Sequence, residues 1–136
     1  MTRKLTGLVV LAVLLAGCAA QKAFRKGENA VHASDWDAAV SEFTAAVQAN
    51  PDNAEYKLNL KRAQEQAAEL HAEKARELEA KDQLDAALSE YRRSLELVNT
   101  DRVAQAKVAE LEQRIRERIE ATRPNFSCTA RSDPMV

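Results

Sequence analysis

An internal repeat constrains the fold of this chain more than any other feature of its sequence. Residues 37–43 read DAAVSEF, and residues 85–91, which lie 48 positions further on, read DAALSEY. Apolar residues in and around both copies recur at intervals of three and four, as they do on one face of a helix. The sequence therefore predicts one helical unit that occurs twice, with both copies burying the same face.

Composition and turn signals predict that every regular element is a helix. The 136 residues include only three Gly and three Pro, and residues that favour helices dominate the rest. Ser34 or Asp35 is placed to cap one helix and Thr100 or Asp101 another, because a side-chain oxygen there can accept from free backbone N–H groups. We expect an all-α chain with helices at residues 20–33, 35–49, 53–81, 83–98 and 101–121.

The helix expected at residues 53–81 is long, because neither Gly nor Pro interrupts it. It would measure roughly 43 Å at 1.5 Å per residue. Two-helix repeats commonly recur every 33 or 34 residues, so the spacing of 48 indicates about 14 additional residues in this helix. Fourteen residues fall about 40° short of four turns. The second unit therefore keeps nearly the same facing while it moves roughly 21 Å along the helix.

Each unit has small residues where its two helices would cross, and an aromatic residue beyond them. In residues 20–53 these positions and the exit turn hold Gly27, Ala39, Ala46, Phe43 and Pro51; in residues 68–101 they hold Ala75, Ala87, Ser94, Tyr91 and Asn99. In this frame, with Trp36 and Leu84 at matching places, the chain resembles a tetratricopeptide (TPR) repeat protein. It departs from that family at Ala23 and Lys26, where larger apolar residues are usual. The resemblance implies antiparallel helical hairpins, one long connecting helix and a C-terminal capping helix at 101–121.

The first residues form an export signal. Arg3 and Lys4 precede a twelve-residue apolar run, which is too short to span a bilayer. The run ends in Leu15, Ala16, Gly17 and Cys18, and this stretch resembles the lipobox of bacterial lipoproteins. The resemblance implies that residues 1–17 are a signal peptide and that Cys18 receives lipid. By the same resemblance, Ala19 in place of Asp favours the outer membrane, facing the periplasm.

No pattern of catalytic or ligand-binding residues stands out in the sequence. His32, His71 and the two cysteines lack the spacing of a metal site, and the many carboxylates alternate with Lys and Arg as on a solvated helix face. No phosphate-binding loop or nucleophile motif occurs. Removal of residues 1–17 leaves 18 basic and 21 acidic side chains, which disfavours nucleic acid. We expect no enzyme activity, no metal or other cofactor, and no small-molecule substrate.

The expected function is that of a lipid-anchored scaffold that binds a protein partner in an envelope, secretion or pilus complex. The TPR resemblance implies that the partner lies in a groove lined by first helices, with Phe24, Glu28, Val31, His32, Arg76 and Glu79 as candidate contacts.

Two alternatives are open for the function of the whole chain. The layout also resembles the N-terminal region of secretin-type channel proteins of type II secretion or type IV pilus systems, of which the chain would be a fragment. The second alternative is a structural lipoprotein whose seams at residues 58–78 and 104–119 pair between chains as a coiled coil. Residues 123–136 have no periodic pattern, so we expect a disordered tail, in which the role of Cys128 is open.

Overall fold

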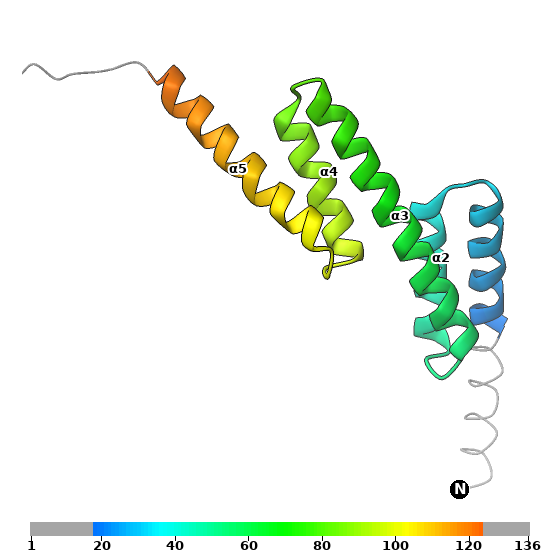
Figure 1. The fold of residues 1–136 in the computed structure, drawn as a ribbon. Helices are drawn as coiled ribbons and strands as arrows, with labels where there is room; N and C mark the ends of the chain where they lie inside the picture. The colour runs from blue at the N-terminus through cyan, green and yellow to red at the C-terminus, as the bar shows by residue number, and fades with distance from the viewer. Residues whose placement is uncertain (1–17, 124–136) are drawn as a thin grey trace, which may run out of the picture.

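A computed structural model describes residues 18–123, and within this range every regular element is a helix. Residues 18–32 are helical, and they are followed by α2 (Trp36–Ala49), α3 (Ala54–Ala80), α4 (Leu84–Leu97) and α5 (Arg102–Thr122) (Figure 1). The predicted all-α class is confirmed, and the predicted bounds of the four helices α2 to α5 agree with the structure within two residues. The predicted signal peptide (1–17) and all but the first residue of the predicted tail lie outside the described residues.

Short polar side chains set the helix starts. The Asp35 carboxylate accepts from the backbone N–H of Ala38, at 3.0 Å, and caps α2. Asn53 caps α3 and Asp101 caps α5, each by accepting from two backbone N–H groups of the first turn. These contacts satisfy donors that a helix start otherwise leaves free. Asp35 and Asp101 are thus the capping residues in the two places where the sequence left a choice.

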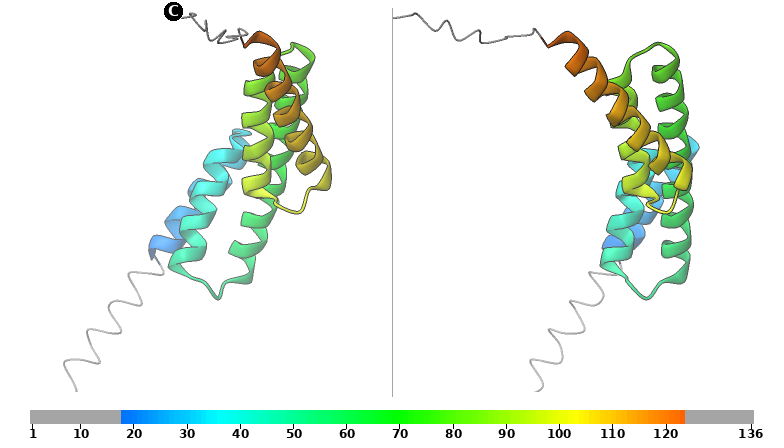
Figure 2. Two further views of the ribbon diagram at one scale, coloured as in Figure 1. Left: turned by 90° about the vertical axis from the view of Figure 1, so that its left-hand side faces the viewer. Right: turned by 60° about the vertical axis from the view of Figure 1, so that its left-hand side comes forward.

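Consecutive helices run antiparallel, and α3 takes part in two helical pairs (Figures 1 and 2). Its first half packs beside α2 and residues 18–32, and its second half beside α4. The helix has 27 residues, which corresponds to about 40 Å. Because α3 continues through both pairs without a break, the molecule is elongated.

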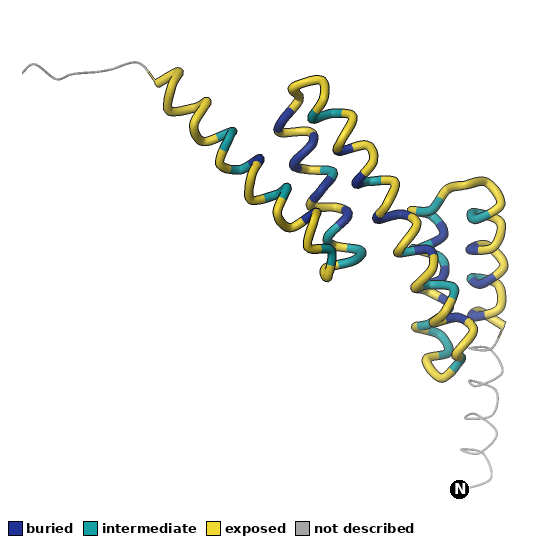
Figure 3. The backbone as a smooth tube through the Cα atoms, in the orientation of Figure 1, coloured by how far each residue is buried: buried dark blue, intermediate teal, exposed yellow. Residues whose placement is uncertain are grey.

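Most of the buried residues form two clusters along this elongated shape (Figure 3). The N-terminal cluster consists of Ala20, Phe24, Ala39, Phe43, Ala46, Tyr56 and Ala63. The C-terminal cluster consists of Ala72, Ala75, Leu84, Ala87, Leu88, Tyr91, Ala104 and Leu111. Alanine is the commonest residue in both, so helix axes approach closely and few large side chains fill each core.

The predicted packing residues lie mostly in these clusters. Trp36 is half-buried against the N-terminal cluster, whereas Pro51 is exposed in the turn after α2. Gly27 is buried where its helix crosses α2, and a Cβ added to it would lie 2.5 Å from Phe43 Cε1. Real carbon atoms pack at about 3.5–4.0 Å. The absence of a side chain at Gly27 therefore permits this helix crossing.

His71 joins the two halves of the molecule. It lies about two-thirds of the way along α3, its side chain is 11% exposed, and its two ring nitrogens contact Glu90 of α4 at 2.7 Å and Asp37 of α2 at 3.2 Å. Arg93 of α4 also lies 3.7 Å from Asp37. Through His71, the long helix thus links a carboxylate of α2 to a carboxylate of α4.

The seams that could have formed a coiled coil between chains are largely used within the chain. Leu60 packs against the N-terminal cluster, and Val108 and Ile115 against the C-terminal cluster. Leu70 and Ile119 remain exposed.

Candidate protein-binding groove

A hollow in the described part of the chain lies between the second half of α3 and α5. It measures about 520 Å³, within the range of about 300–1,000 Å³ that is usual for ligand sites. Its lining residues are Ala72, Arg76, Glu79, Ala80, Tyr91, Asp101, Val103, Ala104, Lys107 and Arg114. The floor is apolar and the rim is charged, which suits a protein segment with one anchoring side chain.

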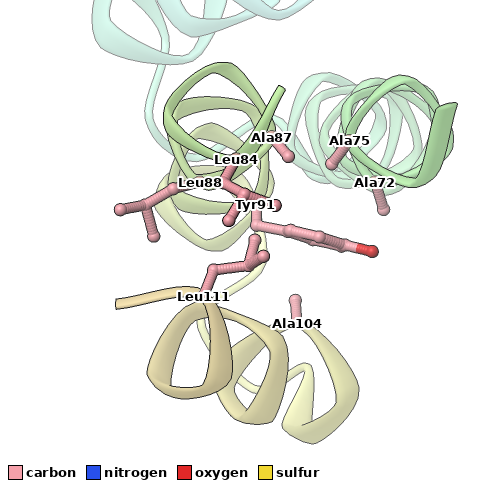
Figure 4. Close-up of a cluster of buried hydrophobic side chains, with 8 residues drawn as sticks. All are labelled: Ala72, Ala75, Leu84, Ala87, Leu88, Tyr91, Ala104 and Leu111. Carbon is pink, nitrogen blue, oxygen red and sulfur yellow. The ribbon is translucent and has the colours of Figure 1, made fainter. Parts of the chain in front are cut away.

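Tyr91 of α4 forms the floor of this hollow. Its ring extends between Ala72 of α3 and Ala104 of α5, and each of these neighbours contributes only a methyl group (Figure 4). Tyr91 is 2% exposed. Burial raises the pKa of its hydroxyl, and the nearby carboxylate of Glu79 raises it further. The hydroxyl is therefore neutral at pH 7.

Ion pairs between α3 and α5 close one side of the hollow. The Glu79 carboxylate lies 3.2 Å from Lys107 Nζ and 3.1 Å from Arg114 Nη1. Hydrogen bonds to Glu110 and to Glu79 raise the pKa of Lys107. These bridges fix the rim because they connect two helices that are separated elsewhere by the hollow.

Arg76 stands on α3 at another part of the rim. Its guanidinium donates to Glu69 on the same helix, at 2.9 Å, and this hydrogen bond raises the pKa of Arg76. The Arg76 side chain is 52% exposed. Glu69 lies two turns earlier on α3 and is itself exposed. The guanidinium of Arg76 therefore stays at the surface, where a partner can reach it.

A smaller hollow, of about 350 Å³, occupies the corresponding place in the N-terminal half. Val31, Trp36 and Phe43 are among its lining residues. Beside it, the Phe24 ring stacks on the Tyr56 ring with centroids 4.7 Å apart and also packs against Phe43 at 5.4 Å. The aromatic pair fills much of the space that remains open in the other half.

The predicted groove residues divide between these two places. Arg76 and Glu79 line the larger hollow, and Val31 lines the smaller one. Glu28 and His32 are exposed and line neither. Phe24, which was also predicted as a groove contact, is 6% exposed and belongs to the core, because Tyr56 of α3 covers it.

Sequence reasoning missed several lining residues of the larger hollow, namely Ala72, Tyr91, Val103, Ala104, Lys107 and Arg114. Four of these belong to α5, which the sequence predicts only as a C-terminal capping helix. The signal was present in the repeat, because Tyr91 corresponds to Phe43 and the α5 residues correspond to the first part of α3.

The described residues contain no group of three His, Cys, Asp or Glu side chains placed to hold a metal ion. Cys18, the expected lipid acceptor, is exposed at the start of the described chain, and Leu15, Ala16 and Gly17 lie outside it. Among residues 18–123 there is no helix with the length and apolar character needed to cross a membrane.

The sequence matches no protein-family model, and no curated protein matches it either.

Proposed function

We propose that this chain is a non-enzymatic, lipid-anchored scaffold of a bacterial envelope that holds a protein partner in the groove between α3 and α5. Its helical pairs would be TPR-like hairpins, with α5 as the capping helix. The partner would belong to an envelope assembly such as a secretion or pilus complex. The lipid on Cys18 would hold the scaffold at the outer membrane, facing the periplasm.

The hollow over Tyr91 is the observation that carries the proposal. Its floor consists of buried apolar residues, and its lining also includes the charged Arg76, Glu79, Asp101, Lys107 and Arg114 and one exposed apolar residue, Val103, which is 70% exposed. Centres of protein interfaces typically combine an apolar pocket with surrounding polar side chains. The repeat frame supports the same groove, since Arg76 and Glu79 were expected there.

Site-specific photocrosslinking in the cells that naturally make the protein tests the groove. A photoreactive amino acid at Val103 should yield a discrete protein adduct. The matched control is the same amino acid at Lys61, on the first half of α3, where the side chain is 72% exposed. Equal adducts from both positions, or none from Val103, would contradict the proposed groove.

The anchor has its own test. Cys18→Ser removes the thiol that would carry the lipid, and stable attachment requires acyl chains that each contribute about 0.8 kcal/mol per buried methylene. We expect the variant to leave the membrane fraction after a carbonate wash, whereas the unaltered protein stays. If the variant still sediments with the envelope, another element anchors the protein.

A further inference from the structure

The floors of the two hollows differ at two equivalent positions. Phe24 and Tyr56 in the N-terminal half correspond, 48 residues on, to Ala72 and Ala104 in the C-terminal half. All four residues are buried, and each belongs to the hydrophobic cluster of its own half. The repeat therefore places two alanines where its other copy has a stacked pair of aromatic rings.

In the N-terminal half this aromatic pair is well held. The two rings stack at an interplanar angle of 26°, and the Tyr56 hydroxyl lies 3.1 Å from Gln21 Oε1, to which it donates. The pair packs on Phe43, which is 2% exposed. In the N-terminal half, this site is therefore occupied by aromatic rings from the chain itself.

The C-terminal half has an aromatic residue at the floor of its hollow, but it lacks the stacked aromatic pair. Tyr91 occupies the place of Phe43 and is equally buried. Leu111 replaces the smaller Ala63, but it lies seven residues beyond Ala104, about 10 Å further along α5. The Tyr91 ring extends between Ala72 and Ala104 (Figure 4), and the hollow of about 520 Å³ lies beside these three residues, where no aromatic pair covers them.

The rim of this hollow differs from its counterpart in charge. Lys107 and Arg114 stand where the N-terminal half has Asn59 and Gln66. Their side chains are 33% and 39% exposed, and they share two carboxylates: that of Glu79, which is 18% exposed, and that of Glu110, which is 49% exposed. Lys107 and Arg114 therefore reach the surface of this rim beside Glu110, for which a carboxylate of a partner can substitute.

We infer that the hollow over Tyr91 takes an aromatic side chain from an acidic segment of the protein partner. The ring lies against Ala72, Tyr91 and Ala104, at the place that corresponds to the aromatic pair of the other half, and a neighbouring carboxylate meets Lys107 or Arg114. This inference rests on the proposed function, because it names the chemistry of the partner at the same groove.

A small probe tests the inference on the full chain, kept soluble with a mild detergent. The probe is 3-phenylpropionate, which joins one aromatic ring to one carboxylate, and its binding is followed by backbone amide chemical shifts. We expect saturable shifts centred on Ala72, Tyr91 and Ala104, with a Kd on the order of 1 mM for so small a ligand. Shifts spread over the surface, or absent at these residues, would overturn the inference.

Filling the hollow from within provides the decisive variant. Ala72→Phe with Ala104→Tyr transplants the aromatic pair of the N-terminal half. We expect a higher Tm and at least about tenfold weaker probe binding, and any remaining shifts measure partition into micelles. A lower Tm together with unchanged binding would overturn the inference.

Two further arms keep the test informative if the double variant does not fold. Arg114→Gln, which copies Gln66 at an exposed position, should weaken binding of 3-phenylpropionate but not of its amide. Phe24→Ala with Tyr56→Ala should create a second probe site near Phe43. Equal loss of both probes in the first variant, or no new site in the second, would contradict the inference.

The outcome is distinguishable from failure of the proposed function. If the adduct from Val103 persists in the filled variant, the groove binds a partner without an aromatic anchor, and only the inference is wrong. If the probe binds as expected but no adduct forms, the hollow exists and the scaffold proposal is wrong.

Discussion

Gly27 lies at the closest crossing of the N-terminal half, and replacing it with Ala tests how the two helices pack. A methyl carbon at this position would lie 2.5 Å from Phe43 Cε1, 2.6 Å from Cδ1 and 3.0 Å from Cγ. Because carbon atoms pack at about 3.5–4.0 Å, the ring or the helix must shift by about 1 Å. The ring is 2% exposed and packs on Phe24, so it has little room to move.

Two opposing effects decide the magnitude for Gly27→Ala. Overpacking a core costs about 1–3 kcal/mol, and three ring atoms in contact place this site near about 2–3 kcal/mol. Ala is favoured over Gly within a helix by about 1 kcal/mol. We therefore expect the free energy of unfolding to fall by about 1–2 kcal/mol, although the same change at an open helical site would raise it.

Thermal unfolding followed by circular dichroism measures the effect. Each kcal/mol lost should lower the Tm by roughly 4–8 °C in a domain of about 100 residues. Ala45→Gly provides the matched control, because Ala45 is exposed on α2 and reports helix propensity without packing. Its expected loss is about 1 kcal/mol.

A double-mutant cycle with Phe43→Leu separates packing from backbone effects. In the Phe43→Leu background the ring is gone, so Gly27→Ala should cost less, with a coupling energy of about 1–2 kcal/mol. Gly27→Ala refutes the reasoning if it raises the Tm, or if it costs the same in both backgrounds.

Two further substitutions probe the junction and the second crossing. Burial favours the neutral form of Glu90, but hydrogen bonds from Lys74 and His71 outweigh it and hold the pKa of Glu90 below its ordinary 4.5. The charge of Glu90 therefore stabilises the fold above pH 4.5, and this contribution is lost as the pH falls further. Glu90→Gln should lower the Tm at pH 7, and the two proteins should converge as the pH falls through the lowered pKa of Glu90; a constant difference in Tm would contradict this. Ala87→Leu places a larger side chain at a site that is 0% exposed and should cost about 1–3 kcal/mol, whereas Ala86→Leu, on the exposed side of the same helix, should leave the Tm nearly unchanged.

The helices of this chain were predictable because their signals are local. Asp35, Asn53 and Asp101 each precede a helix and cap it with their own side chains, and scarce Gly and Pro leave few places where a helix can end. Such signals depend on neighbouring residues only. The all-helical class follows from these signals, whereas the TPR-like arrangement of the hairpins remains a proposal.

The groove was harder to predict because its shape depends on distant residues. Phe24 was placed on the groove face, since the repeat frame considers only residues 20–53. The ring that covers it belongs to Tyr56, which lies just beyond that segment. A comparison of equivalent positions through α5 would have found both the filled site and the empty one, because all four residues are visible in the sequence.

The contacts of His71 could not have been foreseen from the repeat. Its partners Asp37 and Glu90 come from different copies of the repeated segment, and they meet only because of the way the two halves are oriented along α3. The repeat describes each hairpin internally, but it contains no information about the angle between them.

The additional residues of α3 connect the proposed anchor with the proposed groove. Residues 18–32 begin beside the start of α3, as the contact between Gln21 and Tyr56 shows, so Cys18 lies near that end of the long helix (Figure 1). The groove begins at Ala72, eighteen residues into α3, which corresponds to about 27 Å along the helix. A repeat without the additional turns would bring the groove roughly 21 Å closer to the anchored end. The 48-residue spacing would therefore set the reach of the proposed scaffold, because the unbroken helix holds the hollow away from the proposed lipid anchor in a fixed orientation.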